Sequence, residues 1–344
     1  MTLNQASFIR ASTRIYVAGH GGLVGSALVR RLQQDGHASL VTRPRADLDL
    51  RDQVQVRAFF EAERPEIVFL AAAKVGGIWA NASLPAEFIQ QNLAIQSNVI
   101  HEAWRSGVKR LLFLGSSCIY PRECPQPIKE EYLLTGPLEG TNRPYALAKI
   151  AGIEMCWAYN RQYGTRFYSV MPTNLYGPGD NFDLEGSHVI PAMLRKFHEV
   201  KSGDGVRRQV VLWGSGTPRR EFLHVDDTAD ACVFLMNLPD GKLDRVFRGE
   251  GGSDPSISSR APLLNVGCGE DITIRDLAAL IKETVRYEGE IAWDRSKPDG
   301  TPRKLLDVTR LLATGWSARI ALREGLAGTY RWYLENASAA RTKV

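Results

Sequence analysis

The sequence lacks several features that would each place it in a special class of proteins. It has no stretch of about 18 consecutive apolar residues, so no segment is expected to cross a membrane as a helix. The five cysteines are odd in number and form no CxxC pair, which argues against a disulfide framework and a zinc site. No run of five or more like charges occurs, so we expect no nucleic-acid-binding arm.

What remains is the composition of an ordinary globular protein. The 344 residues are enough for two domains, and 44% of them are hydrophobic against 24% charged, whereas a disordered chain would be poorer in apolar residues. The net charge of +5 suits an anionic ligand without identifying one. Because residues 1–13 lack the build of a signal peptide and the cysteines suit a reducing compartment, we expect a cytoplasmic protein without a bound metal.

Short apolar runs alternate with amphipathic segments in the first half of the chain. This alternation predicts an α/β fold with a parallel, doubly wound sheet of the Rossmann type, covered by helices on both faces. The expected strands are 15–18, 40–41, 67–70 and 111–114. The expected helices run from Leu23 to a stop at Gly36, from 51 to 63 and from 86 to 106.

After residue 180 the pattern loosens and predicts a smaller α/β substrate-binding domain. We place the first domain at 10–178, with later segments near 220–265 returning to it, and the second domain mainly at 179–336. Expected in the second half are a strand at 209–213, helices at 227–237, 273–286 and 322–334, a surface loop at 239–262 and a frayed tail at 336–344.

A glycine-rich turn follows the first expected strand. Gly19, Gly22 and Gly25 are spaced by three, where the usual dinucleotide fingerprint reads GxGxxG. Such a turn lets backbone N–H groups approach a pyrophosphate at the start of the next helix, although a tight turn without a ligand is the alternative. The predicted cofactor contacts here are Gly19, His20, Gly21, Gly22, Leu23, Val24 and Gly25.

The end of the second strand carries arginines rather than an acidic residue. Arg45, and with less weight Arg43, are placed to pair with a 2′-phosphate, which would select NADP over NAD. Solvated arginines without a ligand are the alternative. Asp47 and Asp49 follow closely, and Asp49 is a candidate contact for the adenine or the ribose.

Tyr145 and Lys149 are four residues apart, so on a helix they share one face. A phenol is a poor acid–base group at neutral pH, and we expect the nearby lysine cation to lower its pKa. Ser116 follows the strand 111–114, where ligands meet the carboxyl ends of strands, and can hold a substrate oxygen together with the phenol. An ordinary amphipathic helix face is the alternative.

Four longer strings make the signal specific: AAAKVGGI at 71–78, GSSCIYP at 115–121, MPTNLYGP at 171–178 and KPDGTPRK at 297–304. Together with the glycine turn, Ser116 and the Tyr-Lys pair, they resemble the GDP-L-fucose synthases of the extended short-chain dehydrogenase/reductase family. The resemblance spans residues 14–336. It implies an NADP-dependent oxidoreductase and epimerase that converts GDP-4-dehydro-6-deoxy-D-mannose to GDP-L-fucose.

The implied reaction epimerises C3 and C5 of the sugar and then reduces its C4 ketone with NADPH. Within the family, Cys118 would be the base and His188 the acid of the epimerisation. Ser116 and Tyr145 would hold the C4 oxygen, Tyr145 would supply the proton for the reduction, and Lys149 would also bond the nicotinamide ribose. By residue type alone, a buried inert thiol and a structural histidine are the usual readings of Cys118 and His188.

The resemblance also implies ligand contacts and an assembly. Further cofactor contacts would be Leu114, Gly115, Ser116, Lys149, Pro172, Asn174, Leu175 and His188. Contacts to the GDP-sugar would be Lys196, Trp213, Arg220, Asp299 and Lys304. The family's homodimer usually forms through a four-helix interface, which here would include the helix that carries Tyr145.

Two departures from the family's pattern stand out. An arginine that often assists the 2′-phosphate is replaced by Gly21, so NADP preference would rest mainly on Arg45 and be weaker. Lys196 stands where some members have arginine, which loses a bidentate contact. Two other functions stay open: a nucleotide-sugar 4-epimerase with bound NAD, and a non-catalytic NADP-binding sensor.

Overall fold

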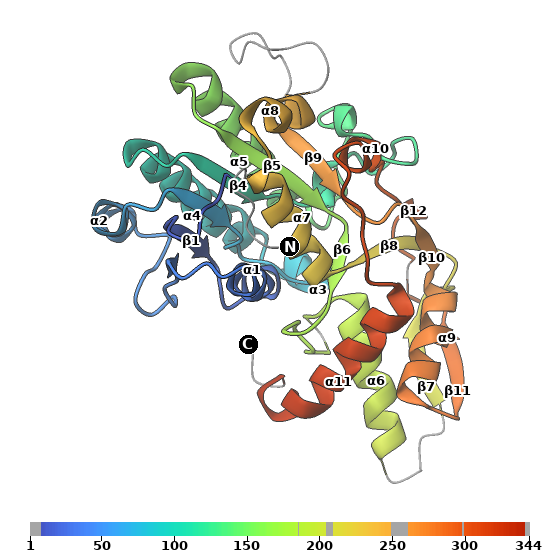
Figure 1. The fold of residues 1–344 in the computed structure, drawn as a ribbon. Helices are drawn as coiled ribbons and strands as arrows, with labels where there is room; N and C mark the ends of the chain where they lie inside the picture. Colours follow the sequence, from blue (N-terminus) through green and yellow to red (C-terminus); the bar gives the residue numbers. More distant parts are fainter. Residues whose placement is uncertain (1–7, 185, 204–208, 249–260, 298, 341–344) are drawn as a thin grey trace.

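A six-stranded parallel sheet forms the centre of the larger part of the molecule (Figure 1). The structure is a computed structural model that describes residues 8–184, 186–203, 209–248, 261–297 and 299–340. In the sheet the strand order is β2-β1-β3-β4-β5-β9. The strands are β1 (Ile15–Ala18), β2 (Leu40–Val41), β3 (Ile67–Leu70), β4 (Arg110–Leu114), β5 (Phe167–Pro172) and β9 (Leu263–Val266). Chain order reverses at β1, the place where ligands bind in doubly wound sheets.

Helices cover both faces of this sheet, as the alternating pattern predicts. On one face lie α2 (Gln53–Glu63), α4 (Pro85–Arg105) and α5 (Arg143–Tyr163), and on the other α1 (Leu23–Gln34) and α7 (Val225–Asn237). The Asp52 carboxylate caps α2 by accepting the N–H groups of Val54 and Gln55. The predicted Rossmann-type α/β fold is confirmed.

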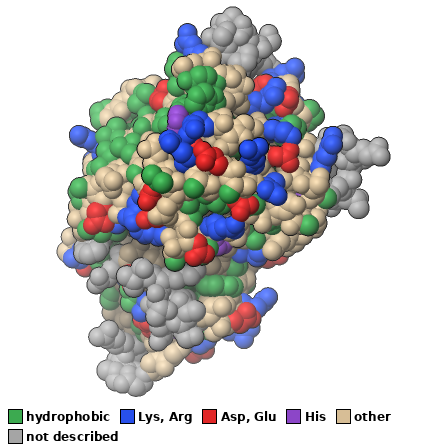
Figure 2. All heavy atoms as spheres, turned by 90° about the vertical axis from the view of Figure 1, so that its left-hand side faces the viewer, with side chains coloured by type: hydrophobic (Ala, Val, Ile, Leu, Met, Phe, Trp, Pro, Cys, Tyr) green, Lys and Arg blue, Asp and Glu red, His purple; other side chains and the backbone are tan. Residues whose placement is uncertain are grey.

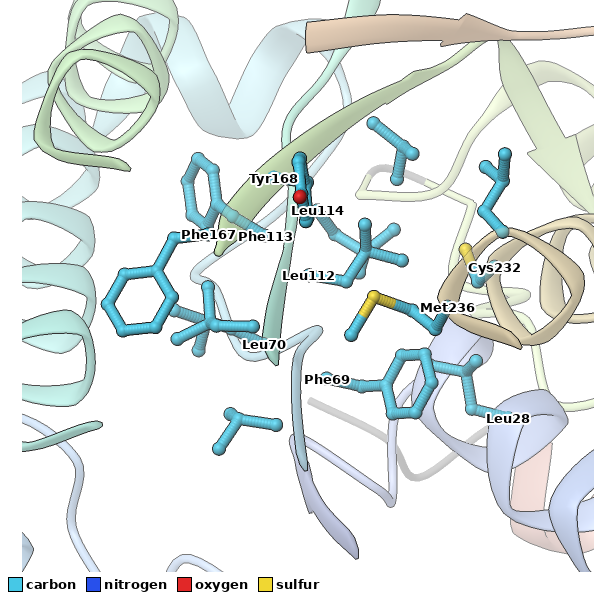
Figure 3. Close-up of a cluster of buried hydrophobic side chains, with 14 of the residues drawn as sticks. Leu28, Phe69, Leu70, Leu112, Phe113, Leu114, Phe167, Tyr168, Cys232 and Met236 are labelled. Carbon is cyan, nitrogen blue, oxygen red and sulfur yellow. The ribbon is translucent and has the colours of Figure 1, made fainter. Parts of the chain in front are cut away.

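The sheet is buried on both faces, and its side chains alternate between them. Figure 3 shows Phe69 and Leu112 on the side of Leu28 from α1 and Met236 from α7. Their strand neighbours point to the opposite side, where α4 and α5 lie. Every residue of β1, β3, β4 and β5 is buried, as expected for a parallel sheet covered on both faces.

The smaller part contains two short sheets and a second hydrophobic cluster. One sheet has the order β10-β8-β12 with β6 also paired to β8, and β7 pairs with β11 in the other. These strands are β6 (Asn174–Tyr176), β7 (Gln209–Trp213), β8 (Arg219–His224), β10 (Asp271–Thr273), β11 (Glu290–Asp294) and β12 (Arg303–Lys304). Its helices are α6 (Val189–Ser202), α9 (Ile274–Val285) and α11 (Leu322–Ala340). As predicted, Thr273 caps α9 by accepting the N–H of Asp276.

Short elements complete the fold. They are α3 (Ile78–Ser83), α8 (Asp240–Arg248), α10 (Thr309–Leu312) and the 3₁₀ turns η1 (Ser117–Ile119) and η2 (Glu130–Tyr132). No helix in the part of the chain that the structure describes has the length and apolarity needed to cross a membrane.

Two local predictions are wrong. The expected loop 239–262 contains α8, because Leu243 and Phe247 are four residues apart and bury the same helix face, with Phe247 against Tyr168. Residues 249–260 of that loop lie outside the described residues. The expected tail from 336 continues α11 as far as Ala340, past a break in helical geometry at Asn336, and residues 341–344 lie outside the described residues.

Candidate active site

The glycine turn lies at the carboxyl end of β1, where the strand order reverses. Gly19 has φ of +82°, and its carbonyl accepts the N–H of Gly22 at 3.0 Å. A Cβ on Gly25 would lie 2.0 Å from the Gly19 oxygen, and one on Gly19 would lie 2.7 Å from the backbone of Ala72. Backbone packing therefore requires glycine at both positions.

The start of α1 offers N–H groups to an anion. Its N-cap is Gly22, which provides no side-chain acceptor for the N–H groups of the first turn. Gly21 is exposed, and a Cβ there would meet nothing within 4 Å. His20, Leu23 and Val24 are half-buried on either side of this opening. A diphosphate fits such a helix terminus by hydrogen bonding and by the helix dipole.

The charged residues after β2 differ in their availability. Arg43 is paired with Glu63 and lies over the ring of Phe59. Arg51 donates hydrogen bonds to the Asp49 carboxylate, and these bonds lower the pKa of Asp49 to about 2. Arg45 is exposed and forms no ion pair with another described residue. Of the two arginines, Arg45 is therefore the one available to a 2′-phosphate, whereas Asp49 already has a partner.

A second set of groups meets where β4 ends. Ser116 accepts the backbone N–H of Cys118 at 3.3 Å, which begins the turn η1. Tyr145 reaches it from the first turn of α5, and its hydroxyl shares a hydrogen bond with the Ser116 side chain. The ring of Tyr145 packs edge-on against Phe88. The structure thus brings together the serine, the tyrosine and the cysteine that the sequence singles out.

Lys149 lies one turn further along α5 and is buried. Its ammonium donates to the Leu114 carbonyl at 2.7 Å, and it lies 4.6 Å from the ring centre of Phe113 and 5.8 Å from that of Tyr145. Gly115 is packed against Met171, which closes this side of the site.

The expected lowering of the Tyr145 pKa is wrong, because the pKa of this phenol is raised. Burial raises the pKa of the Tyr145 hydroxyl, Cys118 raises it further, and the Ser116 hydrogen bond lowers it. Burial also lowers the pKa of Lys149, to about 7, so the lysine is only partly charged near neutral pH. The spacing of the two residues in the sequence does not show how far each side chain is removed from water. Here the effect of desolvation on both pKa values outweighs the attraction between a phenolate and an ammonium.

His188 and Lys304 reach the same place from the other half of the chain. His188 is the N-cap residue of α6, and the Lys304 ammonium lies 3.6 Å from the Cys118 sulfur. His188 is exposed as a residue, yet surrounding protein lowers its pKa, and the Lys304 charge lowers it further. Cys118 is half-buried. The Lys304 charge therefore acts on His188 and lies in contact with Cys118, although these residues come from distant segments.

The loop before α6 is tied to the loop after β3. The N–H of Gly77 donates to the Gly186 carbonyl at 3.0 Å, and a Cβ on Gly77 would lie 2.9 Å from the Ser187 oxygen. Because Ser187 directly precedes His188, this close contact fixes where the histidine leaves the loop. The string at 71–78 thus has a structural role that spacing does not reveal.

Four of the five predicted sugar-nucleotide contacts form a separate group. Trp213 is 64% exposed, with the ammonium groups of Lys196 and Lys297 5.7 and 5.6 Å from its ring centre. Asp299 accepts the backbone N–H of Ser215 at 2.9 Å, two residues beyond Trp213. Arg220 lowers the pKa of Asp299, although the hydrogen bonds from Ser215 lower it more. The fifth predicted contact, Lys304, lies instead against Cys118.

Glu221 escapes the sequence analysis although it organises this region. It is fully buried, and its carboxylate accepts the N–H groups of Gly269 at 2.8 Å and Leu306 at 3.0 Å. Its backbone carbonyl accepts the Asn174 side chain at 2.8 Å. Asn174 is therefore already bonded to the protein, whereas Pro172 and Leu175 lie on either side of it at the end of β5 and in β6. An isolated acidic residue between Arg220 and Phe222 gives no signal in the sequence.

Comparisons with known proteins agree with this geometry. The profile of the "NAD dependent epimerase/dehydratase family" matches residues 15–247. A GDP-L-fucose synthase of Arabidopsis thaliana is 55% identical over 94% of this chain and 94% of its own length. The GDP-L-fucose synthase of Escherichia coli (strain K12) is 54% identical over 94% of this chain and 97% of its own.

A solved structure extends the likeness to three dimensions. The crystal structure of a GDP-L-fucose synthetase from Naegleria fowleri bound to NADP matches with a TM-score of 0.84 and 28% identity, over 99% of this chain and 98% of that one. Among the described residues of the present chain, no group of three or more His, Cys, Asp or Glu is arranged to hold a metal ion. The chain belongs to the NAD dependent epimerase/dehydratase family, and its relatives from Arabidopsis thaliana and Escherichia coli named above are GDP-L-fucose synthases.

Proposed function

We propose that this protein converts GDP-4-dehydro-6-deoxy-D-mannose to GDP-L-fucose, by epimerisation at C3 and C5 followed by NADPH-dependent reduction at C4. One observation carries the proposal: the acid–base groups for both steps meet at one place. Ser116 and Tyr145 share a hydrogen bond, Cys118 lies next to both, and Lys304, which contacts the Cys118 sulfur, also lowers the pKa of His188. A simple 4-epimerase has no need of the cysteine and histidine.

The epimerisation uses groups that exchange protons with carbon. The Cys118 thiolate removes the proton next to the C4 ketone, and the electron pair moves onto the C4 oxygen as an enolate. Ser116 and Tyr145 donate hydrogen bonds to that oxygen, which stabilises the charge as it develops. His188, protonated, returns a proton to the carbon from the other face, and the sequence repeats at the second carbon.

The reduction uses the same oxygen site. When bound, NADPH supplies the hydride for C4. Tyr145 gives its hydroxyl proton to the C4 oxygen, and Ser116 keeps that oxygen in place. The raised pKa of Tyr145 suits this task, because a phenol that resists ionisation keeps its proton until the alkoxide forms.

The two halves of the chain divide the ligands. Residues 10–178, with returning segments near 220–265, bind NADP through the glycine turn, Arg45, Leu114, Gly115 and the segment 172–175, and Lys149 bonds the nicotinamide ribose. Residues 179–336 bind the GDP-sugar, with Trp213 stacking on guanine and with Lys196, Arg220 and Asp299 around the nucleotide. The exposed Trp213 face between two ammonium groups supports this division.

One assay tests the reaction. GDP-4-dehydro-6-deoxy-D-mannose is supplied with NADPH, and the absorbance of the reduced cofactor is followed while the product is identified by NMR. We expect one NADPH to be oxidised for each GDP-L-fucose formed. Substrate conversion without net oxidation would instead indicate a 4-epimerase, and binding without turnover would indicate a sensor.

Deuterium exchange tests the epimerisation separately. In deuterated water we expect label at C3 and C5 with the parent protein and none with Cys118→Ser. Cys124→Ser is the matched control, because Cys124 is also half-buried and the charge of Lys304 opposes the rise that burial causes in its pKa. Normal exchange in Cys118→Ser would overturn the role of the thiol.

We also propose a cytoplasmic homodimer that forms through α4 and α5. Trp104, Tyr159 and Tyr163 of these helices pack together with His101, and Tyr163 is 45% exposed. Figure 2 shows this side of the molecule, with hydrophobic side chains gathered among charged ones. Light scattering should give twice the monomer mass, and Tyr163→Glu should lower the measured mass.

The free cysteines support the cytoplasmic part of this proposal, because they suit a reducing compartment.

A further inference from the structure

The Lys304 ammonium lies 3.6 Å from the Cys118 sulfur, so this predicted substrate contact places a positive charge beside a thiol. We propose that the Lys304 ammonium stabilises the thiolate of Cys118 and so favours the form of this side chain that removes a proton from carbon. This inference rests on the proposed function for its biological meaning. The contact itself exists in the ligand-free chain and is tested there.

The geometry around the sulfur supports this role. The Lys304 ammonium points its N–H at the Cys118 sulfur across 3.6 Å, a hydrogen-bonding distance for sulfur. Two neighbours of Cys118 are the Ser116 side chain, which accepts its backbone N–H, and the Tyr145 hydroxyl, whose pKa Cys118 raises, and neither carries a positive charge. Lys304 forms no ion pair with a carboxylate among the described residues, so its charge is not neutralised nearby.

The backbone that carries Lys304 is held on both sides. In β12, Lys304 pairs with Arg220 of β8, beside β10 (Figure 1). The next residue, Leu305, donates its N–H to Gln126 at 2.9 Å and accepts from Ile128 at 2.7 Å. The N–H of Leu306 donates to the buried Glu221 carboxylate at 3.0 Å. The backbone position of Lys304 is therefore fixed by contacts with three other segments.

The same ammonium reaches two other titratable groups. It lowers the pKa of His188 after burial has already lowered it, and it opposes the rise that burial causes in the pKa of Cys124. A cation at this place favours the thiolate of Cys118 and disfavours the imidazolium of His188. Removing the charge should move both titrations to higher pH, because a nearby cation favours the deprotonated form of each group.

The first experiment measures the thiol in the free protein. Iodoacetamide alkylation of Cys118 is followed by peptide mass spectrometry as the pH is raised, in the parent, Lys304→Gln, Lys304→Arg and Lys109→Gln. We expect the midpoint to rise by about one unit in Lys304→Gln, so that the rate near neutral pH falls about tenfold. Lys304→Arg should keep most of the effect, because it keeps the charge.

Lys109→Gln is the matched control for loss of one positive charge. Lys109 precedes the start of β4 and pairs with Glu66, whereas Cys118 follows the other end of that strand. We expect its alkylation profile to equal that of the parent. A Lys304→Gln profile with an unchanged midpoint, in a protein whose circular dichroism is native, would overturn the inference. If Lys304→Gln does not fold, Lys304→Met gives the same comparison.

The second experiment separates charge tuning from diphosphate binding. We expect the affinity for GDP, measured by calorimetry, to stay near the parent value in Lys304→Gln, while the pH profile of C3 and C5 exchange moves upward. A large loss of GDP affinity with an unmoved exchange profile would make Lys304 a substrate contact and refute the inference. If the parent shows no exchange at all, the proposed function fails, yet the alkylation profile still decides the Cys118–Lys304 contact.

Discussion

The Tyr145–Lys149 pair and the Cys118–Lys304–His188 group lie at the same edge of the sheet, yet different forces act on them. Lys149 is buried and Tyr145 is half-buried, and desolvation moves the pKa of both toward their neutral forms. In the second group Cys118 and Lys304 are half-buried and His188 is exposed, and the Lys304 ammonium lies against the Cys118 sulfur. A group that must keep its proton until late suits burial, whereas a group that must exchange protons with carbon suits a neighbouring charge.

The largest expected effects come from two substitutions, each of which removes one of the two steps of the reaction. Tyr145→Phe removes the proton donor for C4 and should lower the reduction rate by about 10²–10⁴-fold, while exchange at C3 and C5 continues at a reduced rate. Cys118→Ser should do the reverse and abolish exchange. Single-turnover reduction and deuterium incorporation are measured on both variants. If Tyr145→Phe and Cys118→Ser each lost reduction and exchange to the same extent, the two groups of residues would act as one catalytic unit.

The next effect tests the glycine turn as a backbone feature. A Cβ on Gly25 would lie 2.0 Å from a backbone oxygen, so Gly25→Ala should cost about 1–3 kcal/mol of stability and weaken NADPH binding strongly. Denaturant unfolding and fluorescence titration measure the two changes. Gly328→Ala in α11 is the control, because its Cβ would meet nothing within 4 Å and alanine favours helix. Unchanged NADPH affinity in Gly25→Ala would argue against a diphosphate at this turn.

Burial of Lys149 predicts a smaller, pH-dependent effect on stability. Its pKa falls to about 7 in the folded chain against about 10.4 when unfolded, so between these values the unfolded chain binds one more proton. The stability of the NADPH-free parent should therefore rise relative to Lys149→Met as pH increases above 7, by up to about 1.4 kcal/mol per unit. Denaturant unfolding across this range measures the gap between the two proteins. If the difference in unfolding free energy between the parent and Lys149→Met stays constant with pH, the Lys149 ammonium is hydrated in the folded chain.

The sequence predicts elements whose causes are local. The buried runs at 67–70 and 111–114 are strands, and Gly19 and Gly25 lie in a turn that only glycine fits. It does not predict contacts between distant segments: Cys118 and Lys304 are 186 residues apart, and only the pairing of β12 with β8 brings the lysine near. Burial is equally invisible, which is why the expected pKa of Tyr145 has the wrong direction.

The smallest expected effect concerns the choice between NADPH and NADH at Gly21. This residue lies in the glycine turn, next to the place where an arginine side chain could contact the 2′-phosphate. The position is exposed, its φ is not positive, and a Cβ would meet nothing within 4 Å, so Gly21→Arg should fold normally. An added guanidinium near a 2′-phosphate should raise the preference for NADPH over NADH by about fivefold, the value of one exposed ion pair of about 1 kcal/mol. The ratio of kcat/KM for the two cofactors measures it, with Arg45→Gln lowering the same ratio. If Gly21→Arg leaves the ratio unchanged while Arg45→Gln removes it, Arg45 alone recognises the phosphate and the open space at Gly21 has no part in the choice.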